Sequence, residues 1–199
     1  MIIIRDMGLS FHYKGALKNP QSLKSMIEEV VDIASTNEWK YLIYGDEFPE
    51  NSFSSDDKND SLCGIIITPP DCEPVCLTFF SDGKLVNGIH LKLPHPEKQH
   101  EDVYLSVKTQ FAGAAIHIQL ITLFEYLNKK YFENFDLYDE GNFWETKNEQ
   151  LLKETFAKYN NLIEGFDSLL SAIPMKDEET IEAYLLRIAA MNGKRNEGN

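Results

Sequence analysis

The 199-residue sequence has few cysteines and no long hydrophobic run. Its three cysteines, Cys63, Cys72 and Cys76, are an odd number for a fully paired disulfide framework, so the sequence predicts a chain of the reducing cytoplasm. No stretch approaches the ~18 consecutive apolar residues of a membrane span, and the apolar start is too short for a signal peptide. We therefore expect no membrane partner.

Positive charge is also scarce. The sequence has 19 Lys and Arg against 32 Asp and Glu, which gives a formal net charge of -13. A field of this sign repels phosphate backbones and anionic lipid surfaces, so nucleic acid is disfavoured as a partner. The same field favours a basic protein as a partner.

The motifs of the common enzyme classes are missing. The sequence contains no G-x-S-x-G, G-x-x-x-x-G-K-[ST], G-x-G-x-x-G or H-E-x-x-H pattern, which favours a protein that is not an enzyme and that uses no cofactor. Cys72 and Cys76 lack a second ligand pair at zinc-site spacing. His90, His95 and His100 recur in a proline-containing stretch that fits neither a helix nor a strand face, so we predict solvated loop histidines and no metal site.

Hydrophobic periodicity predicts a mixed α+β chain. Residues 8–14 alternate apolar and polar at period two, which indicates a strand, and Asn19 and Pro20 then begin an amphipathic helix. Polar composition predicts loops at 48–61 and 87–102. The other predicted elements are strands at 40–44, 62–68, 75–80, 103–111, 135–138 and 142–145 and a buried helix at 114–132.

The C-terminal part predicts two helices joined by a turn. Thr146 opens a capping-box pattern before a long apolar seam from Leu152 to Ile173, and Pro174 ends that helix. Asp177 can cap the second helix. We expect a sheet domain at 1–146, a helical hairpin packed on it at 147–191, and a frayed tail at 192–199.

The order strand, helix, strand occurs twice in the sheet domain, opened by Leu9-Ser10 and later by Leu105-Ser106. This repeated order predicts an antiparallel or mixed sheet of about six strands with helices on one face, of ferredoxin-like type. Chance similarity and a duplicated strand-helix-strand unit both explain it. In such a sheet the two opening strands are neighbours.

That arrangement defines a candidate binding surface. His12 and Lys14 share one face of the first strand, and Lys108 and Gln110 share one face of the predicted strand at 103–111, which opens the second strand-helix-strand unit. His117, in the first turn of the buried helix, is either a general base or a satisfied core histidine. The remaining members come from the turns that follow the sheet, and they are Asp139, Glu140, Trp144 and Glu145.

These patterns lead to three hypotheses of function. The first is a protein-interaction module for a basic partner, such as an immunity-type inhibitor of a cationic toxin, with aromatic anchors near 138–144. The alternative is a small-molecule-binding or hydrolytic domain that uses the polar sheet face. The third is a homodimer through the seam from Leu152 to Ile173. The polar residues of the sheet could also serve only to solvate its open face, or form ion pairs under the C-terminal helices.

Overall fold

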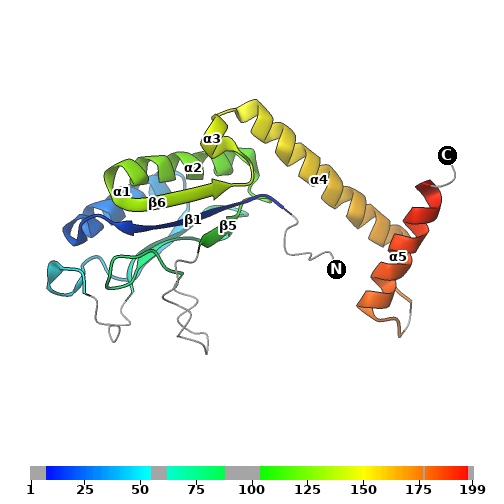
Figure 1. Cartoon of the computed structure of the whole chain (residues 1–199), viewed down its shortest axis with the longest axis horizontal. Helices are drawn as coiled ribbons and strands as arrows, with labels where there is room; N and C mark the ends of the chain where they lie inside the picture. Colours follow the sequence, from blue (N-terminus) through cyan, green and yellow to red (C-terminus); the bar gives the residue numbers. More distant parts are fainter. Residues whose placement is uncertain (1–7, 55–61, 88–103, 177, 197–199) are drawn as a thin grey trace. The chain divides into compact units, whose positions relative to one another are not determined.

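The computed structural model describes residues 8–54, 62–87, 104–176 and 178–196. The chain forms two compact units, Met1–Phe156 and Ala157–Asn199. The elements in Figure 1 are strands β1 (Ser10–Leu17), β2 (Lys40–Ile43), β3 (Cys63–Thr68), β4 (Val75–Phe79), β5 (Leu105–Lys108) and β6 (Phe132–Asp139), helices α1 (Leu23–Thr36), α2 (Gly113–Lys130), α3 (Phe143–Thr146), α4 (Glu149–Ala172) and α5 (Ile181–Asn196), and short 3-10 turns at Pro20–Ser22 and Pro49–Asn51.

The fold is α+β, as predicted, but its strands form two sheets. The first sheet has the order β5-β1-β6 and the second has the order β2-β3-β4, and all pairings are antiparallel. The predicted single sheet of about six strands with a ferredoxin-like order is therefore wrong. The reason is that β2 pairs with β3 along its whole length and does not join the sheet of β1.

The first sheet brings distant parts of the sequence together. β1 lies between β5 and β6, with His12 opposite Ser106 on one side and opposite Tyr138 on the other. The prediction that the two opening strands are neighbours is confirmed. β5 and β6 both run antiparallel to β1, so they are parallel to each other and α2 makes the crossover between them, as Figure 1 shows.

The alternation along β1 separates a core face from a polar face. Phe11 and Tyr13 are fully buried, whereas Ser10, His12 and Lys14 are only partly buried. The aromatic rings of Phe11 and Tyr13 pack against Phe124 of α2, with centroids 5.5 and 4.4 Å away. α2 therefore covers the core face of the first sheet, while α1 packs against β2 and β3.

The two sheets are joined through β1. The Tyr13 hydroxyl donates a hydrogen bond to the Cys76 carbonyl at 2.7 Å and accepts one from the Cys76 N–H at 3.0 Å. Farther along β1, Ala16 forms an isolated β-bridge with Lys84. The C-terminal half of β1 thus contacts the chain that follows β4, which ties the second sheet to the first.

The predicted strand at 142–145 is wrong, because this segment is the short helix α3. Asn142 has a φ of 56°, which turns the chain out of β6, and the Asp139 carboxylate accepts hydrogen bonds from the N–H groups of Phe143 and Trp144. A carboxylate that satisfies the first N–H groups of a helix favours helical over extended backbone.

α4 begins later than the capping pattern predicts. Thr146 belongs to α3, and the Asn148 side chain instead accepts a hydrogen bond from the Leu151 N–H at 3.1 Å. Leu152 and Phe156 are buried, so the first turns of α4 belong to the unit that contains the sheets. That the hairpin packs on the sheet domain stays a prediction.

The second unit contains the rest of α4 and α5. Arg187 makes two hydrogen bonds to the Glu179 carboxylate, at 2.7 and 2.8 Å, and a third to the Pro174 carbonyl at 3.1 Å. These bonds fix the connection between the two helices. The Thr180 hydroxyl accepts from the Ala183 N–H at the start of α5, which continues to Asn196.

Several predictions fall on residues outside the described ranges. They concern Asp177 and most of the loop at 87–102, including His90, His95 and His100. Among the helices that the structure describes, none combines the length and hydropathy of a bilayer span.

Candidate functional site

The outward side of the first sheet carries four of the nine residues that the sequence analysis selected, namely His12, Lys14, Lys108 and Glu140. β5, β1 and β6 each present alternate side chains away from α2. We call this surface the polar sheet face, and it consists of Ser10, His12, Lys14, Tyr104, Ser106, Lys108, Asp136, Tyr138 and Glu140.

His12 and Glu140 form the centre of this face. The His12 Nε2 lies 3.4 Å from Glu140 Oε1, and Glu140 Oε2 accepts a hydrogen bond from the Ser10 N–H at 2.7 Å. The His12 ring stacks on Tyr138 with a centroid distance of 5.8 Å and an interplanar angle of 21°. Tyr138 remains 58% exposed, so its other surface is free to contact a ligand or partner.

Lys14 lies in a second cluster on the same face. Its ammonium group is 4.8 Å from the centroid of the Tyr104 ring, within cation-π range. The Tyr104 hydroxyl donates a hydrogen bond to the Asp136 carboxylate, and this bond raises the pKa of Tyr104 above its ordinary value. Lys14 and Asp136 are opposite each other across the β1–β6 pair. This face therefore offers cations, carboxylates and aromatic rings side by side.

A polar pocket of about 310 Å³ opens at the His12 end of the face. The Glu73 carboxylate reaches its rim from the turn before β4 and accepts a hydrogen bond from the Lys108 N–H at 2.8 Å. Most of the groups that line the pocket can donate or accept hydrogen bonds, and the lining residues are Gly8, Ser10, His12, Glu73, Ser106, Lys108 and Glu140.

Five of the predicted site residues do not belong to the polar sheet face: Gln110, Trp144, Glu145 and the buried pair His117 and Asp139. Gln110 is 2% exposed, and its side-chain oxygen accepts a hydrogen bond from the Leu9 N–H at 2.9 Å. Trp144 and Glu145 lie on α3, and the Trp144 ring packs against Phe135. Gln110 is separated because β5 ends at Lys108, so strand alternation no longer determines where its side chain points.

His117 and Asp139 are buried beneath the sheet. His117 Nδ1 lies 2.7 Å from the Thr109 hydroxyl, and His117 Nε2 lies 3.0 Å from Asp139 Oδ1. Both side chains are fully buried, although the second contact is poorly aligned for a hydrogen bond. The ring of Phe156 in α4 packs edge-on against the imidazole at 5.7 Å. His117 does not line the polar pocket, so the core-histidine interpretation fits its position better than the general-base one.

The environment of Asp139 keeps its carboxylate ionised. Burial raises the pKa of Asp139, but the contact with His117 and the N–H groups of Trp144 and Gly141 lower it by more, so the pKa lies below its ordinary value. Gly141 allows this close packing, because a Cβ there would come within 2.5 Å of the Leu152 side chain. We conclude that Asp139 holds the β6–α3 turn in place.

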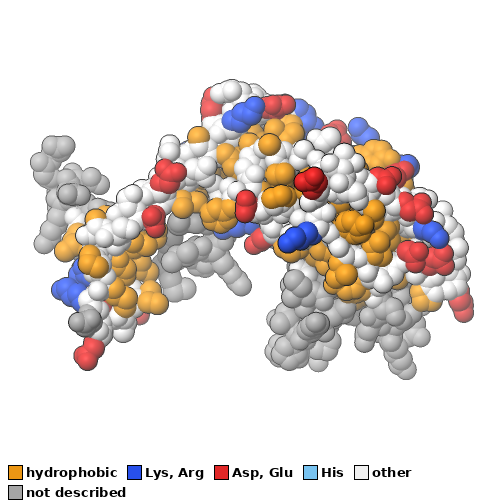
Figure 2. Space-filling model, turned by 180° about the vertical axis from the view of Figure 1, so that it is seen from behind, with side chains coloured by type: hydrophobic (Ala, Val, Ile, Leu, Met, Phe, Trp, Pro, Cys, Tyr) orange, Lys and Arg blue, Asp and Glu red, His pale blue; other side chains and the backbone are white. Residues whose placement is uncertain are grey.

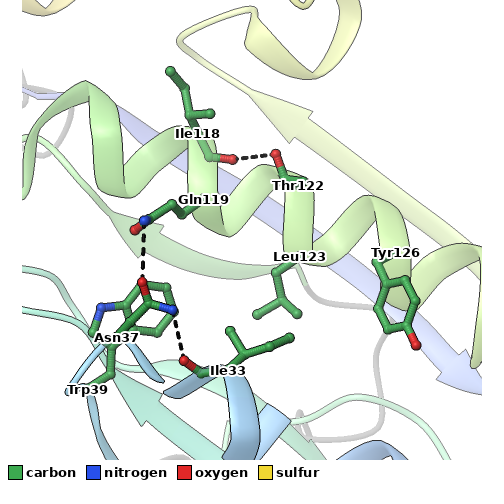
Figure 3. A pocket seen from close by; sticks show the side chains of 8 residues that line it. All are labelled: Ile33, Asn37, Trp39, Ile118, Gln119, Thr122, Leu123 and Tyr126. Carbon is green, nitrogen blue, oxygen red and sulfur yellow. Dashed lines mark hydrogen bonds between the residues drawn. The ribbon is translucent and has the colours of Figure 1, made fainter. Parts of the chain in front are cut away.

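A second cavity, of about 320 Å³, lies between α1 and α2 and is mostly apolar. Figure 3 shows Asn37 and Gln119 on opposite sides of it, joined by a hydrogen bond of 3.4 Å. Trp39, which immediately precedes β2, lines the same cavity. The sequence analysis did not predict this cavity.

No protein-family model, curated protein or solved structure matches this chain. Among the residues described by the structure, no group of three or more His, Cys, Asp or Glu side chains is placed to hold a metal ion.

The sequence analysis did not select several residues of the site, among them Ser10, Ser106, Tyr104, Asp136 and Glu73. Tyr104 and Asp136 follow the same period-two alternation as Lys108 and Glu140, so strand periodicity could have identified them. Glu73 lies in a turn between two other strands, and no local pattern indicates its contact with Lys108.

Proposed function

We propose that this protein is an interaction module that binds a basic protein through the polar sheet face. The observation that carries the proposal is the exposed Tyr138 ring beside the carboxylates of Asp136 and Glu140. Tyrosine supplies a large contact area at low entropic cost, and carboxylates pair with the Lys and Arg of a partner.

The net charge supports the same conclusion. A formal charge of -13 accelerates encounter with a cationic protein, and the mixed charges of the polar sheet face then select among such proteins. An immunity-type inhibitor, which binds and blocks a cationic toxin, is one protein of this kind.

The test is a comparison of captured proteins. Immobilised full-length chain is exposed to a fractionated cell extract at low and moderate salt, and bound proteins are identified by mass spectrometry. We expect a basic protein that binds the wild type, binds less as salt increases, and is lost with Tyr138→Ala. The matched control is Tyr126→Ala, because Tyr126 is 41% exposed and lies on α2.

Two outcomes would overturn the proposal. One is that no basic protein is recovered at either salt concentration. The other is that Tyr138→Ala and Tyr126→Ala retain the same proteins, which would show that binding does not depend on the polar sheet face. Far-UV circular dichroism of both variants excludes a loss of folding as the cause.

The polar pocket favours a second candidate function, a small-molecule-binding or hydrolytic domain. His12 lies across from Ser106 and beside Glu140, so a base and a hydroxyl group line one concave site. The mixture of ammonium and carboxylate groups complements a zwitterion. Calorimetric titration with a panel of free amino acids tests this function: saturable heat that disappears with His12→Ala supports it, and no heat with any of them counts against it.

A further inference from the structure

Strand β2 is an edge strand with an unusual surface. Among the residues that the structure describes, it pairs with β3 on one side only, and all four of its residues are exposed. Tyr41, Leu42 and Ile43 are 45%, 57% and 42% exposed, and the following Tyr44 is 46% exposed. Natural proteins normally protect such edges with charges, prolines or bulges, because a bare hydrophobic edge pairs with other chains.

The hydrogen-bonding pattern shows which backbone groups this edge offers. The Tyr44 N–H donates to the Gly64 carbonyl of β3, and Leu42 is opposite Ile66. Backbone groups in an antiparallel strand point alternately to its two sides. The N–H and C=O groups of Tyr41 and Ile43 therefore point away from β3, toward the open edge.

We propose that β2 pairs antiparallel with β2 of a second copy of this chain, which joins the two three-stranded sheets into one. A two-fold axis at Ile43 places the outward N–H and C=O of one Ile43 against those of the other. The same register places Lys40 of each copy opposite Asp46 of the other, and Leu42 opposite Tyr44. The edge is therefore complementary to itself in hydrogen bonding, charge and apolar contact.

The exposed apolar surface of this edge comes from the strand itself. Trp39 lies directly before β2 and lines the cavity between α1 and α2, but it is only 5% exposed and adds little to the outer surface. Seen from behind, hydrophobic side chains gather over the sheet-containing unit, with acidic and basic side chains around them (Figure 2).

The first experiment measures the mass of the full-length chain by analytical ultracentrifugation over a concentration series. We expect a reversible dimer at physiological ionic strength, where repulsion between the two acidic copies is screened beyond about 8 Å. Ile43→Lys places two lysines opposite each other at the two-fold axis, so it should weaken the dimer by about tenfold or more. Leu162→Lys is the matched control, because Leu162 is 59% exposed and lies on α4.

A charge swap tests the register itself. Lys40→Asp places two carboxylates opposite each other, and Asp46→Lys places two lysines opposite each other. Each single variant should weaken the dimer severalfold. The double variant Lys40→Asp/Asp46→Lys restores opposite charges and should return the dissociation constant toward that of the wild type.

The outcomes separate this interface from the alternatives. A monomer at every concentration overturns the proposal. A dimer that Leu162→Lys disrupts and Ile43→Lys leaves intact places the contact on α4 and also overturns it. A double charge variant as weak as its parents excludes the register centred on Ile43. Thermal unfolding of each variant shows whether a change in mass reflects the interface or a loss of folding.

Discussion

His117 Nε2 lies 3.0 Å from Asp139 Oδ1, and both side chains are fully buried. The contact joins α2 to the end of β6 at the point where the chain turns into α3. Asp139 also accepts hydrogen bonds from the N–H groups of Gly141, Phe143 and Trp144, at 2.7 to 3.0 Å. One carboxylate therefore satisfies three backbone donors and faces one imidazole.

Replacing this carboxylate should be costly. Asp139→Asn removes the negative charge and one of the two acceptor oxygens, which leaves buried N–H groups without a partner. We expect a loss of about 3 kcal/mol in the free energy of unfolding, measured by urea denaturation at pH 7. Asp32→Asn, at an exposed position of α1, is the control and should change stability little.

The same carboxylate should make stability depend on pH. The pKa of Asp139 in the folded protein lies below its ordinary value, so its stabilising contribution is complete above the unfolded pKa of about 3.9. That contribution is lost as the pH falls through the folded pKa. The stability gap between wild type and Asp139→Asn should therefore shrink below about pH 4, and a gap that stays constant down to pH 2 would contradict this explanation.

Gly64 should not tolerate any side chain. Its φ is +116°, and a Cβ would lie 2.1 Å from the Leu77 carbonyl oxygen on β4. Gly64→Ala should therefore lower the free energy of unfolding by about 3 kcal/mol, because it combines backbone strain with a steric clash. Gly165 in α4 has open space around it, so Gly165→Ala should not destabilise the protein. Equal melting temperatures for the two variants would refute the prediction.

The sequence predicted the polar sheet face better than it predicted the sheet. His12, Lys14 and Lys108 follow from strand alternation, which is a local pattern, whereas Glu140 was predicted from the turn after the strand at 135–138. The pairing partner of β2 is not local, because Leu42 and Ile43 would suit any neighbouring strand. Just beyond the strand ends, tertiary hydrogen bonds determine where side chains point. Gln110 is an example, because its side-chain oxygen accepts a hydrogen bond from the Leu9 N–H.

The three thiols should react slowly in the folded protein. Burial raises the pKa of Cys72 to about 12, with a further contribution from Glu73, and burial raises the pKa of Cys76 to about 11. Burial and the charge of Asp46 also raise the pKa of Cys63. The thiolate is the reactive form, so labelling with a disulfide reagent at pH 8 should be much slower than for free cysteine.

Unfolding supplies the control for this measurement. In guanidinium chloride all three cysteines should react at the rate of free cysteine. Fast labelling of one cysteine in the native protein would show that its surroundings open more readily than the fold indicates.

The link between the two sheets can be tested with the removal of one oxygen atom. The fully buried Tyr13 hydroxyl bonds both the N–H and the C=O of Cys76, and Tyr13→Phe leaves both groups without that partner. An unsatisfied buried polar group costs about 1–3 kcal/mol, so we expect a loss of about 2 kcal/mol in the free energy of unfolding. Tyr126→Phe, at an exposed position of α2, removes a hydroxyl that bonds Glu29 and should cost much less, because water replaces that bond. If both substitutions cost the same, the buried hydroxyl does not stabilise the junction between the sheets.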